Sequence, residues 1–246
     1  MMARQKQAGK LAGNPRTLVV DVGGSGVKMM ILDGRGRPVT ERDRIPTPRP
    51  ATPKSLVQAI LKLARRQDRF DRVSVGFPGV VRRGVVETAP NLDGKWGGIR
   101  LARLVSAGLG KPTRVANDAD VQGFGAIQGS GVELVLTLGT GMGSALFLEG
   151  RLVPNLELPH HPFRRGDTYE DQLGAAALKK IGKKTWNKRL AKAIGTLDRT
   201  FNYDRLWLGG GNAKKVTVTL PPNVKIVPNV AGLLGGIALW RDGKAC

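Results

Sequence analysis

The stretch LVVDVGGSGVK at residues 18–28 determines the fold of this chain. Apolar residues before Asp21 and the apolar run 27–32 flank a glycine-rich turn, a pattern that predicts a β-hairpin with an acidic residue at its mouth. Such a turn exposes backbone N–H groups, and its glycines let an anion approach them. Ser25 adds a hydroxyl donor, and Asp21 could hold a divalent cation against a phosphate. Most glycine-rich turns bind nothing, so the hairpin alone leaves both interpretations open.

A second hairpin of the same plan follows later in the chain. Strand-like residues 133–138 run into the turn GTGMG at 139–143, and residues 144–148 lead back. This repeat predicts two similar halves that face one another, with both turns gripping one phosphate chain.

The remaining hydrophobic spacing predicts alternating helices and strands, which together indicate an α/β fold. Strands are expected at 38–45, 72–77, 113–116, 205–208 and 224–227, with short pieces at 80–81 and 85–86. Helices are expected at 53–64, 99–109, 118–128, 169–201 and 229–240. We expect a disordered basic tail at 1–16, a small N-terminal α/β domain at 17–116 joined by a C-terminal helix at 229–243, and a larger C-terminal α/β domain at 117–228.

The composition indicates the kind of partner. The 246 residues include 40 Lys and Arg against 19 Asp and Glu, a net charge of +21, which favours work beside polyanions, although basic proteomes raise the charge of many proteins. The single cysteine, Cys246, excludes an internal disulfide and a cysteine-based zinc cluster, and it suggests a reducing, cytoplasmic setting. Because no apolar run is long enough for a signal peptide or a membrane span, we expect a soluble protein.

Several segments then follow one another in a distinctive order: DVGGSGVK at 21–28, RIPTPRPATP at 44–53, VGFPGVV at 75–81, NLDGKW at 91–96, NDAD at 117–120, LTLGTGMGSALFLEGRLVPNLEL at 136–158 and LGGG at 208–211. In order and spacing they resemble the ROK family of sugar kinases, and most closely its polyphosphate-dependent glucokinase (glucomannokinase) branch. The resemblance implies a two-domain actin/hexokinase-like (ribonuclease H-like) kinase fold and a homodimer. It also implies transfer of a phosphoryl group from inorganic polyphosphate, ATP or both to the 6-hydroxyl of glucose, with mannose as a further candidate acceptor.

The resemblance further implies roles for single residues around the sugar. Asp118 would be the general base that takes the proton of the 6-hydroxyl, although a helix N-cap is the commoner use of such a residue. Asn91 and Asn117 would hydrogen-bond ring hydroxyls. Glu157 and His160 would contact hydroxyls near the anomeric end. Pro159 stands where the family usually has glycine and fixes a backbone angle there, which bears on the placement of His160.

Around the phosphates, the resemblance implies that Asp21 organises Mg²⁺ through water. Many members carry a lysine where Gly26 stands, and we expect its absence to widen the groove, a hint of a polymeric donor. Many members also have a His/Cys zinc cluster, but His160 and His161 cannot supply four ligands, so no structural zinc is expected. The implied phosphate contacts are Gly23, Gly24, Ser25, Lys28, Gly139, Thr140, Gly141, Gly209, Gly210 and Gly211.

A row of lysines adds a hypothesis about the donor. Lys180, Lys184, Lys188 and Lys192 are spaced by four, so a continuous helix would align them on one face. A solvated face is the ordinary explanation, and Gly182 could break the row. We hypothesise a polyphosphate track that leads to the glycine turns, made of Arg164, Arg165, Lys180, Lys184 and Lys188.

Three other functions remain open from the sequence. An ATP-dependent kinase of another hexose would use the same residues. A sugar-sensing regulator would need a helix-turn-helix segment, which we do not expect because the stretch before Leu18 is too short to hold one. A catalytically decayed relative could bind nucleic acid or other polyanions, but the aromatic residues form no stacking motif, so no specific nucleic-acid binding is expected.

Overall fold

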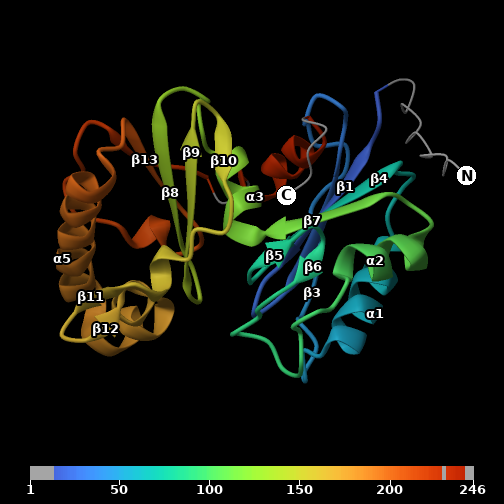
Figure 1. Cartoon of the computed structure of the whole chain (residues 1–246), viewed down its shortest axis with the longest axis horizontal. Coiled ribbons are helices and arrows are strands. Elements are labelled where there is room, and N and C mark those ends of the chain that lie inside the picture. The colour runs from blue at the N-terminus through green and yellow to red at the C-terminus, as the bar shows by residue number, and fades with distance from the viewer. Residues whose placement is uncertain (1–13, 229–230, 242–246) are drawn as a thin grey trace, which may run out of the picture.

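The computed structural model describes residues 14–228 and 231–241, and it contains two five-stranded sheets that lie side by side (Figure 1). The first sheet has the order β3-β2-β1-β4-β7 and comprises β1 (Thr17–Val22), β2 (Val27–Leu32), β3 (Asp43–Ile45), β4 (Arg72–Phe77) and β7 (Thr113–Asn117). The second has the order β10-β9-β8-β13-β14 and comprises β8 (Val132–Leu138), β9 (Met142–Leu148), β10 (Arg151–Val153), β13 (Arg205–Gly209) and β14 (Val224–Ile226).

Both sheets have the same topology. In the first, β1 and β2 form an antiparallel hairpin, and β4 and β7 join it as parallel strands. In the second, β8 and β9 form the hairpin, and β13 and β14 are the parallel strands. The third strand, β3 or β10, pairs antiparallel at the hairpin's outer edge. The prediction of two similar halves is therefore confirmed.

Helices and short ladders complete the fold. The helices are α1 (Pro53–Ala64), α2 (Leu101–Leu109), α3 (Asp118–Phe124), α4 (Tyr169–Leu173), α5 (Ala175–Phe201) and α6 (Ala231–Leu234), with 3₁₀ turns η1 (Leu158–His160), η2 (Ala213–Lys215) and η3 (Gly235–Trp240). Two small ladders pair β5 (Val81–Arg82) with β6 (Val85–Val86) and β11 (Pro162–Arg164) with β12 (Asp167–Thr168). Among the residues with described structure, no helix is long and apolar enough to cross a membrane.

The first sheet is covered on both faces. On one face α1 contributes Leu56, Ile60 and Leu63 to the core, and α2 contributes Leu101 and Val105. α1 begins where the sequence indicates, because Thr52 caps it in a capping box with Ser55 and Pro53 occupies the first turn.

The C-terminal segment covers the other face. Leu233 and Ile237 pack on Val19, Met30 and Leu32. The same segment also lies close to α3, because Gly235 has no side chain. A Cβ at this position would collide with the backbone carbonyl of Val121 in α3.

Trp240 fastens the end of this segment. Its indole Nε1 donates to Ser74 Oγ at 2.8 Å, and Ser74 Oγ donates to the carbonyl of Gly236 at 2.7 Å. The guanidinium groups of Arg72 and Arg114 lie 5.0 and 4.5 Å from the centre of the indole ring, in cation–π geometry.

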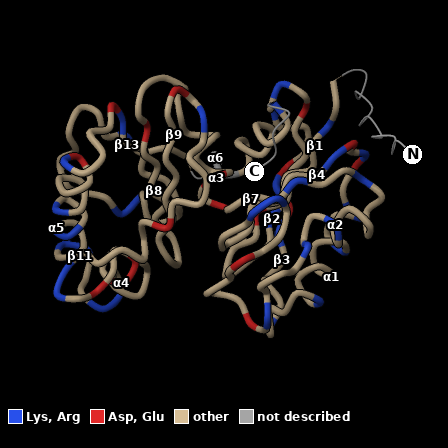
Figure 2. The backbone as a smooth tube through the Cα atoms, in the orientation of Figure 1, with Lys and Arg blue, Asp and Glu red and all other residues tan. Residues whose placement is uncertain are grey.

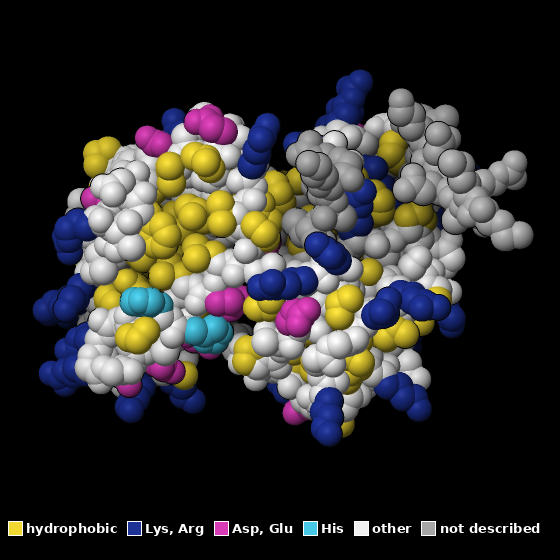
Figure 3. Space-filling model, in the orientation of Figure 1, with side chains coloured by type: hydrophobic (Ala, Val, Ile, Leu, Met, Phe, Trp, Pro, Cys, Tyr) yellow, Lys and Arg dark blue, Asp and Glu magenta, His cyan; other side chains and the backbone are white. Residues whose placement is uncertain are grey.

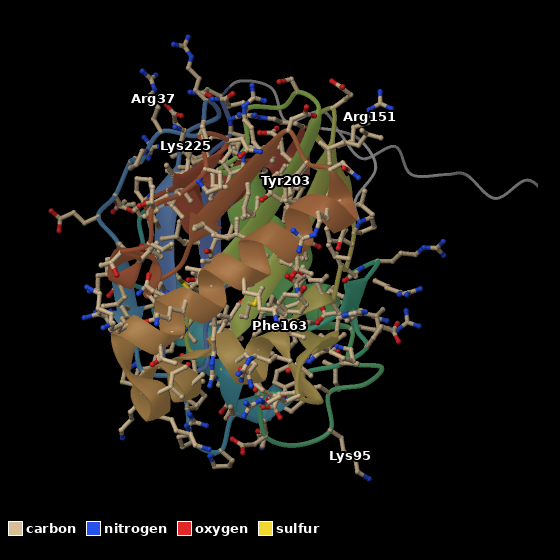
Figure 4. All side chains as sticks on the ribbon, turned by 90° about the vertical axis from the view of Figure 1, so that its left-hand side faces the viewer. Arg37, Lys95, Arg151, Phe163, Tyr203 and Lys225 are labelled. Carbon is tan, nitrogen blue, oxygen red and sulfur yellow. The ribbon has the colours of Figure 1, made fainter. Side chains whose placement is uncertain are left out.

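The second sheet lies between α5 and α3. α5 crosses one face (Figure 4), where Trp186, Leu190 and Ile194 pack in the core. On the other face, Phe147 of β9 meets Phe124 of α3 edge to face, with ring centroids 5.0 Å apart. α3 therefore lies where the two halves meet, in contact with both sheets and with the C-terminal segment.

Several predicted bounds are wrong. Of the strand predicted at 38–45, only β3 at 43–45 forms. The helix predicted at 118–128 ends at Phe124, because the chain turns at Gly125. The predicted helix 169–201 stops at Gly174, and α5 is kinked at Gly182, whose φ of 73° is not helical. Gly174 takes an extended conformation that ends one helix before the next begins.

The predicted termini fall partly outside the described residues. Of the tail at 1–16, residues 1–13 lie outside, and Arg16 is ordered, since its backbone N–H donates to Asp71 at 2.9 Å. Of the helix at 229–243, residues 229–230 and 242–243 lie outside, and the remainder is α6 followed by η3. The division into domains at 17–116 and 117–228 stays a prediction.

Replacing Trp240 should show how strongly the C-terminal segment holds the first sheet. Trp240→Ala removes the ring, both cation–π contacts and the bond to Ser74, so we expect a loss of about 3 kcal/mol in the free energy of unfolding, measured by urea titration. Trp240→Phe keeps most of the ring and should lose only about 1 kcal/mol. Equal stability of Trp240→Ala and the parent protein would contradict this role.

Candidate active site

A cleft of about 430 Å³ opens between the two halves. Its walls come from the turns after β1 and β8, the ends of β4 and β7, the segment before η1, and α4. Figure 3 shows acidic and histidine side chains gathered where the halves meet.

Most predicted site residues line this one cleft. They are Asp21, Gly23, Gly24, Ser25, Lys28, Asn91, Asn117, Asp118, Gly139, Thr140, Gly141, Glu157, His160, Gly210 and Gly211. Gly209 ends β13 just behind the lining. The five residues of the hypothetical polyphosphate track are not part of the lining.

The first glycine turn is held by its carbonyl groups. Thr47 Oγ1 donates to the carbonyl of Gly23 at 2.5 Å, Arg49 to that of Gly24 at 3.1 Å, and Arg44 to that of Ser25 at 3.3 Å. All three donors belong to the RIPTPRPATP segment, which explains why that segment accompanies the turn. Because a carbonyl oxygen repels a phosphate, tying these oxygens to donors removes an obstacle to anion binding.

The space beside Gly26 is filled, which corrects the prediction of a wider groove. A Cβ on Gly26 would lie 2.5 Å from Nε of Arg44, so the guanidinium already occupies the position that a side chain at residue 26 would need. The turn thus has a cation beside it, supplied from β3 instead of from the turn itself.

The loop that carries Asn91 is tied to the same segment. Asp93 Oδ2 accepts from the N–H of Ala51 at 2.7 Å and lies 3.9 Å from Arg49 Nη1. Trp96 Nε1 donates to the carbonyl of Asp93 at 3.0 Å. The ring centroids of Trp96 and Phe77 are 4.9 Å apart. Asn91 is exposed at the rim of the cleft.

The second glycine turn has different anchors. Asn212 donates to the carbonyl of Gly139 at 2.9 Å, and the N–H of Met142 donates to Glu170 Oε2 at 2.9 Å. The Glu170 carboxylate lies against Gly141, where a Cβ would collide with it. The turn is therefore held by α4 on one side and by the residue that follows LGGG on the other.

Asn117 and Asp118 occupy different positions at the start of α3. Asn117 is the N-cap: its Oδ1 accepts from the N–H groups of Ala119 and Asp120 at 2.8 and 3.3 Å, and its Nδ2 donates to the carbonyl of Gly79 at 3.1 Å. Asp118 is then the first residue of the helix and is not needed as a cap. Its partly buried carboxyl group lines the cleft, and its Oδ1 accepts from the N–H of Ala119 at 2.8 Å, so the N-cap of α3 is Asn117 and not Asp118.

The electrostatics of the cleft favour a proton-accepting Asp118. Burial, helped by the negative charge of Asp21, raises the pKa of Asp118 to about 8. Asp21 is itself paired, since Lys28 Nζ lies 2.7 Å from its Oδ2. A carboxylate with a raised pKa is a stronger base, which suits removal of a proton from an alcohol.

Asp120 links α3 to the segment that carries Glu157. It is buried, its Oδ2 accepts from the N–H of Asn155 at 3.3 Å, and burial raises its pKa to about 7. Asn155 Oδ1 in turn accepts from the N–H of Val81 in β5 at 3.1 Å. Asn155 therefore bridges the first half of the chain and α3.

Glu157 and His160 lie together on the opposite wall. His160 Nε2 is 3.4 Å from Glu157 Oε2, and burial raises the pKa of Glu157. Pro159 is buried within η1, whose turn is closed by the N–H of His160 donating to the carbonyl of Glu157 at 3.1 Å. Proline at this position thus forms the turn that brings His160 to the cleft.

The residues present are compatible with Mg²⁺ that arrives with a phosphorylated substrate. Within residues 14–228 and 231–241, no group of three or more His, Cys, Asp or Glu side chains could hold a metal ion by itself. Mg²⁺ usually keeps several waters and is held by one or two carboxylates together with substrate phosphates. Asp21, which lines the cleft beside the glycine turns, would supply the protein part of such a site.

The lysine row does not form one face. The kink at Gly182 separates Lys180 from Lys184, Lys188 and Lys192, which share the straight part of α5. Figure 2 shows the cations of α5 on the outer side of the second sheet.

Sequence reasoning missed residues that the tertiary fold brings to the cleft. Arg49 and Glu170 line it, as does Gln122 of α3. Arg49 lies in a segment that the motif comparison had singled out, so its place could have been suspected. For Glu170 the sequence offers only the helix start at Thr168, which indicates a first helical turn and nothing about the cleft.

Comparisons with known proteins show which family the sequence matches. The model of the ROK family matches residues 17–154. A polyphosphate glucokinase of Mycobacterium tuberculosis is 32% identical over 234 residues, which cover 88% of this chain and 88% of that protein. A glucokinase of Streptomyces coelicolor is 32% identical over 146 residues, which cover 55% of this chain and 44% of that protein.

Two solved structures are similar over most of the chain. The inorganic polyphosphate/ATP-glucomannokinase of an Arthrobacter species has a TM-score of 0.83 and 33% identity, and the match covers 92% of this chain and 98% of that one. A ROK family glucokinase of Streptomyces griseus, solved with glucose and AMPPNP, has a TM-score of 0.77 and 21% identity, covering 93% and 100%; this second likeness shows the fold alone.

The raised pKa of Asp118 predicts a stability effect of known sign. Unfolding releases Asp118 to its ordinary pKa near 4, so the parent protein loses stability as pH rises from about 4 to 8. Asp118→Asn removes the titrating group. The free energy of unfolding of the variant, taken relative to that of the parent protein, should therefore increase by on the order of 2 kcal/mol from pH 5 to pH 8.5. The measurement is the free energy of unfolding at both pH values.

The control is Asp68→Asn, which changes an exposed carboxylate and should show no such difference. A constant offset between Asp118→Asn and the parent protein at both pH values would contradict the assignment.

Proposed function

Since the chain belongs to the ROK family, we propose that it transfers a phosphoryl group from inorganic polyphosphate or ATP to the 6-hydroxyl of glucose. The observation that carries this proposal is the place of Asp118, whose carboxyl group is not the N-cap of α3 and lines a cleft together with two glycine turns. The names of the relatives support the donor and the acceptor, because a polyphosphate glucokinase and a polyphosphate/ATP-glucomannokinase match most of the chain at 32% and 33% identity.

In the proposed reaction, Asp118 accepts the proton of the 6-hydroxyl while the hydroxyl oxygen bonds to the terminal phosphorus of the donor. The bond from that phosphorus to its bridging oxygen breaks, which leaves sugar 6-phosphate and either ADP or a polyphosphate shorter by one unit. Asp21 would hold Mg²⁺ that arrives with the donor, and the ion would neutralise phosphate charge. The chain's own part is to hold the two reactants in line and to take the proton.

The other lining residues have proposed roles in binding. Glu157 and His160 would hold sugar hydroxyls from the second half, and Asn91 from the first. Asn117 would act chiefly on Asp118, because its amide oxygen and nitrogen are already bonded to α3 and Gly79. The glycine turns, with Ser25 and Lys28, would receive the phosphates.

Three finer features belong to the same proposal. Mannose is a second acceptor, in keeping with the glucomannokinase name of the Arthrobacter protein. The protein works as a homodimer, as the resemblance implies. It acts in the cytoplasm, where its single cysteine would stay reduced.

A direct assay tests the function. Purified protein is incubated with Mg²⁺, glucose or mannose, and either polyphosphate or ATP, and sugar 6-phosphate is measured. We expect product with glucose, and a loss of about 10²- to 10⁴-fold in kcat for Asp118→Asn with little change in glucose affinity. Asp68→Asn, the exposed control, should retain full activity. Appreciable turnover by Asp118→Asn would reject Asp118 as the base, and salt-sensitive RNA binding without any product would favour the decayed relative.

The pH profile gives a separate test of the base. Because Asp118 must be ionised to accept a proton, kcat/KM for glucose should rise with pH and level off near its pKa of about 8. The measurement is initial rate against pH from 6 to 9 at low glucose, with glucose binding measured by calorimetry across the same range as a control. A flat profile between pH 6 and pH 8 would contradict the raised pKa.

A further inference from the structure

A second groove, of about 520 Å³, lies between α5 and the loop after η2, and it shares no lining residue with the cleft. One wall is the straight part of α5 after the kink at Gly182, and the other is the loop that follows η2. Its lining consists of Lys183, Lys184, Asn187, Lys188, Ala191, Thr217 and Val218.

Asn187 gives this groove a fixed shape. Its side chain is only 5% exposed and makes four hydrogen bonds. Nδ2 donates to the carbonyls of Lys183 and Lys215 at 2.9 and 3.1 Å, and Oδ1 accepts from the N–H groups of Thr217 and Val218 at 2.7 and 3.2 Å. The loop is thereby fastened to α5, so the lysines stand beside a preformed wall.

The groove carries positive charge that no acidic residue balances. The sequence has no Asp or Glu between Asp171 and Asp198, nor between Asp204 and Asp242. In the part of the chain that the structure describes, none of the ion pairs involves a lysine of α5. Lys184 and Lys188 are four residues apart on one helix, a spacing at which like charges destabilise the helix, so a bound anion would stabilise it.

A short run of the chain connects the groove with the cleft. Gly210 and Gly211 line the cleft, and Thr217 lines the groove. Between them η2 exposes Lys214 and Lys215. Cations therefore lead from the phosphate end of the cleft to the groove.

We propose that this groove binds the distal part of an inorganic polyphosphate chain whose terminal phosphate reacts in the cleft. The inference rests on the proposed function for its donor. A polymer of closely spaced charges can contact Lys183, Lys184 and Lys188 together. Nucleic acid suits the groove less well, because no aromatic side chain is among the lining residues to stack on a base.

The groove also revises the hypothetical track. Lys184 and Lys188 belong to it, together with Lys183. Lys180 precedes the kink, and Arg164 and Arg165 lie in the β11–β12 ladder and its turn, so these three are not part of the groove.

The test reverses three charges. In Lys183→Glu/Lys184→Glu/Lys188→Glu, the KM for long-chain polyphosphate should rise about tenfold or more, because distal phosphate contacts are replaced by repulsion. The KM values for tripolyphosphate and ATP, whose few phosphates we expect to be held within the cleft, should change less than about twofold. The matched control is Lys54→Glu/Lys62→Glu/Arg103→Glu, which reverses three exposed charges on α1 and α2 and should alter none of these values.

Direct binding separates this proposal from the proposed function. Fluorescently labelled long-chain polyphosphate should bind the parent protein without sugar and bind the α5 variant about tenfold more weakly. Such a loss supports the groove even if no sugar is phosphorylated. Unchanged polyphosphate binding, an equal rise in KM for short and long donors, or an equal loss of affinity for single-stranded RNA would each overturn it.

Discussion

The cleft depends on one constraint, which is that the carbonyl oxygens of a glycine-rich turn must be kept away from an incoming anion. In the first turn, hydrogen bonds from Arg44, Thr47 and Arg49 bind the carbonyls of Ser25, Gly23 and Gly24. In the second, Asn212 binds that of Gly139. Because the C=O and N–H groups of a peptide unit lie in one plane and point in opposite directions, a hydrogen bond that fixes the carbonyl also fixes the direction of the N–H group. The segments that supply these donors are therefore as much part of the site as the turns.

The two halves share a topology but not their chemistry. The first half surrounds its turn with cations, and it carries the paired Asp21 and Lys28. The second half supports its turn with the carboxylate of Glu170 and presents Glu157 to the cleft. α3 lies at the junction, and Asn117 and Asp120 tie it to both sides, through Gly79 and through Asn155. Asp118 is thus placed by the bonds that its neighbours make and by its own bond from the N–H of Ala119.

The strand periodicity and the glycine positions were enough to predict both hairpins and their repetition, because these depend on local pattern and on chain order. Most of the predicted cleft residues came instead from the resemblance to the ROK family. The sequence could not show that Asn117 caps α3 and so frees Asp118, since both residues are good caps. Nor could it show that Arg44 fills the space beside Gly26, or that Glu170 reaches Gly141. Those contacts join residues far apart in the chain, and only packing decides them.

The C-terminal segment has a consequence for how the chain is made. Leu233 and Ile237 cover Val19, Met30 and Leu32, yet more than 200 residues separate the two groups in synthesis. During translation that face of the first sheet stays uncovered until residues 233–237 leave the ribosome, while the second half, which is continuous in sequence, can already assemble its core. The half that is made first is thus completed after the half that is made second.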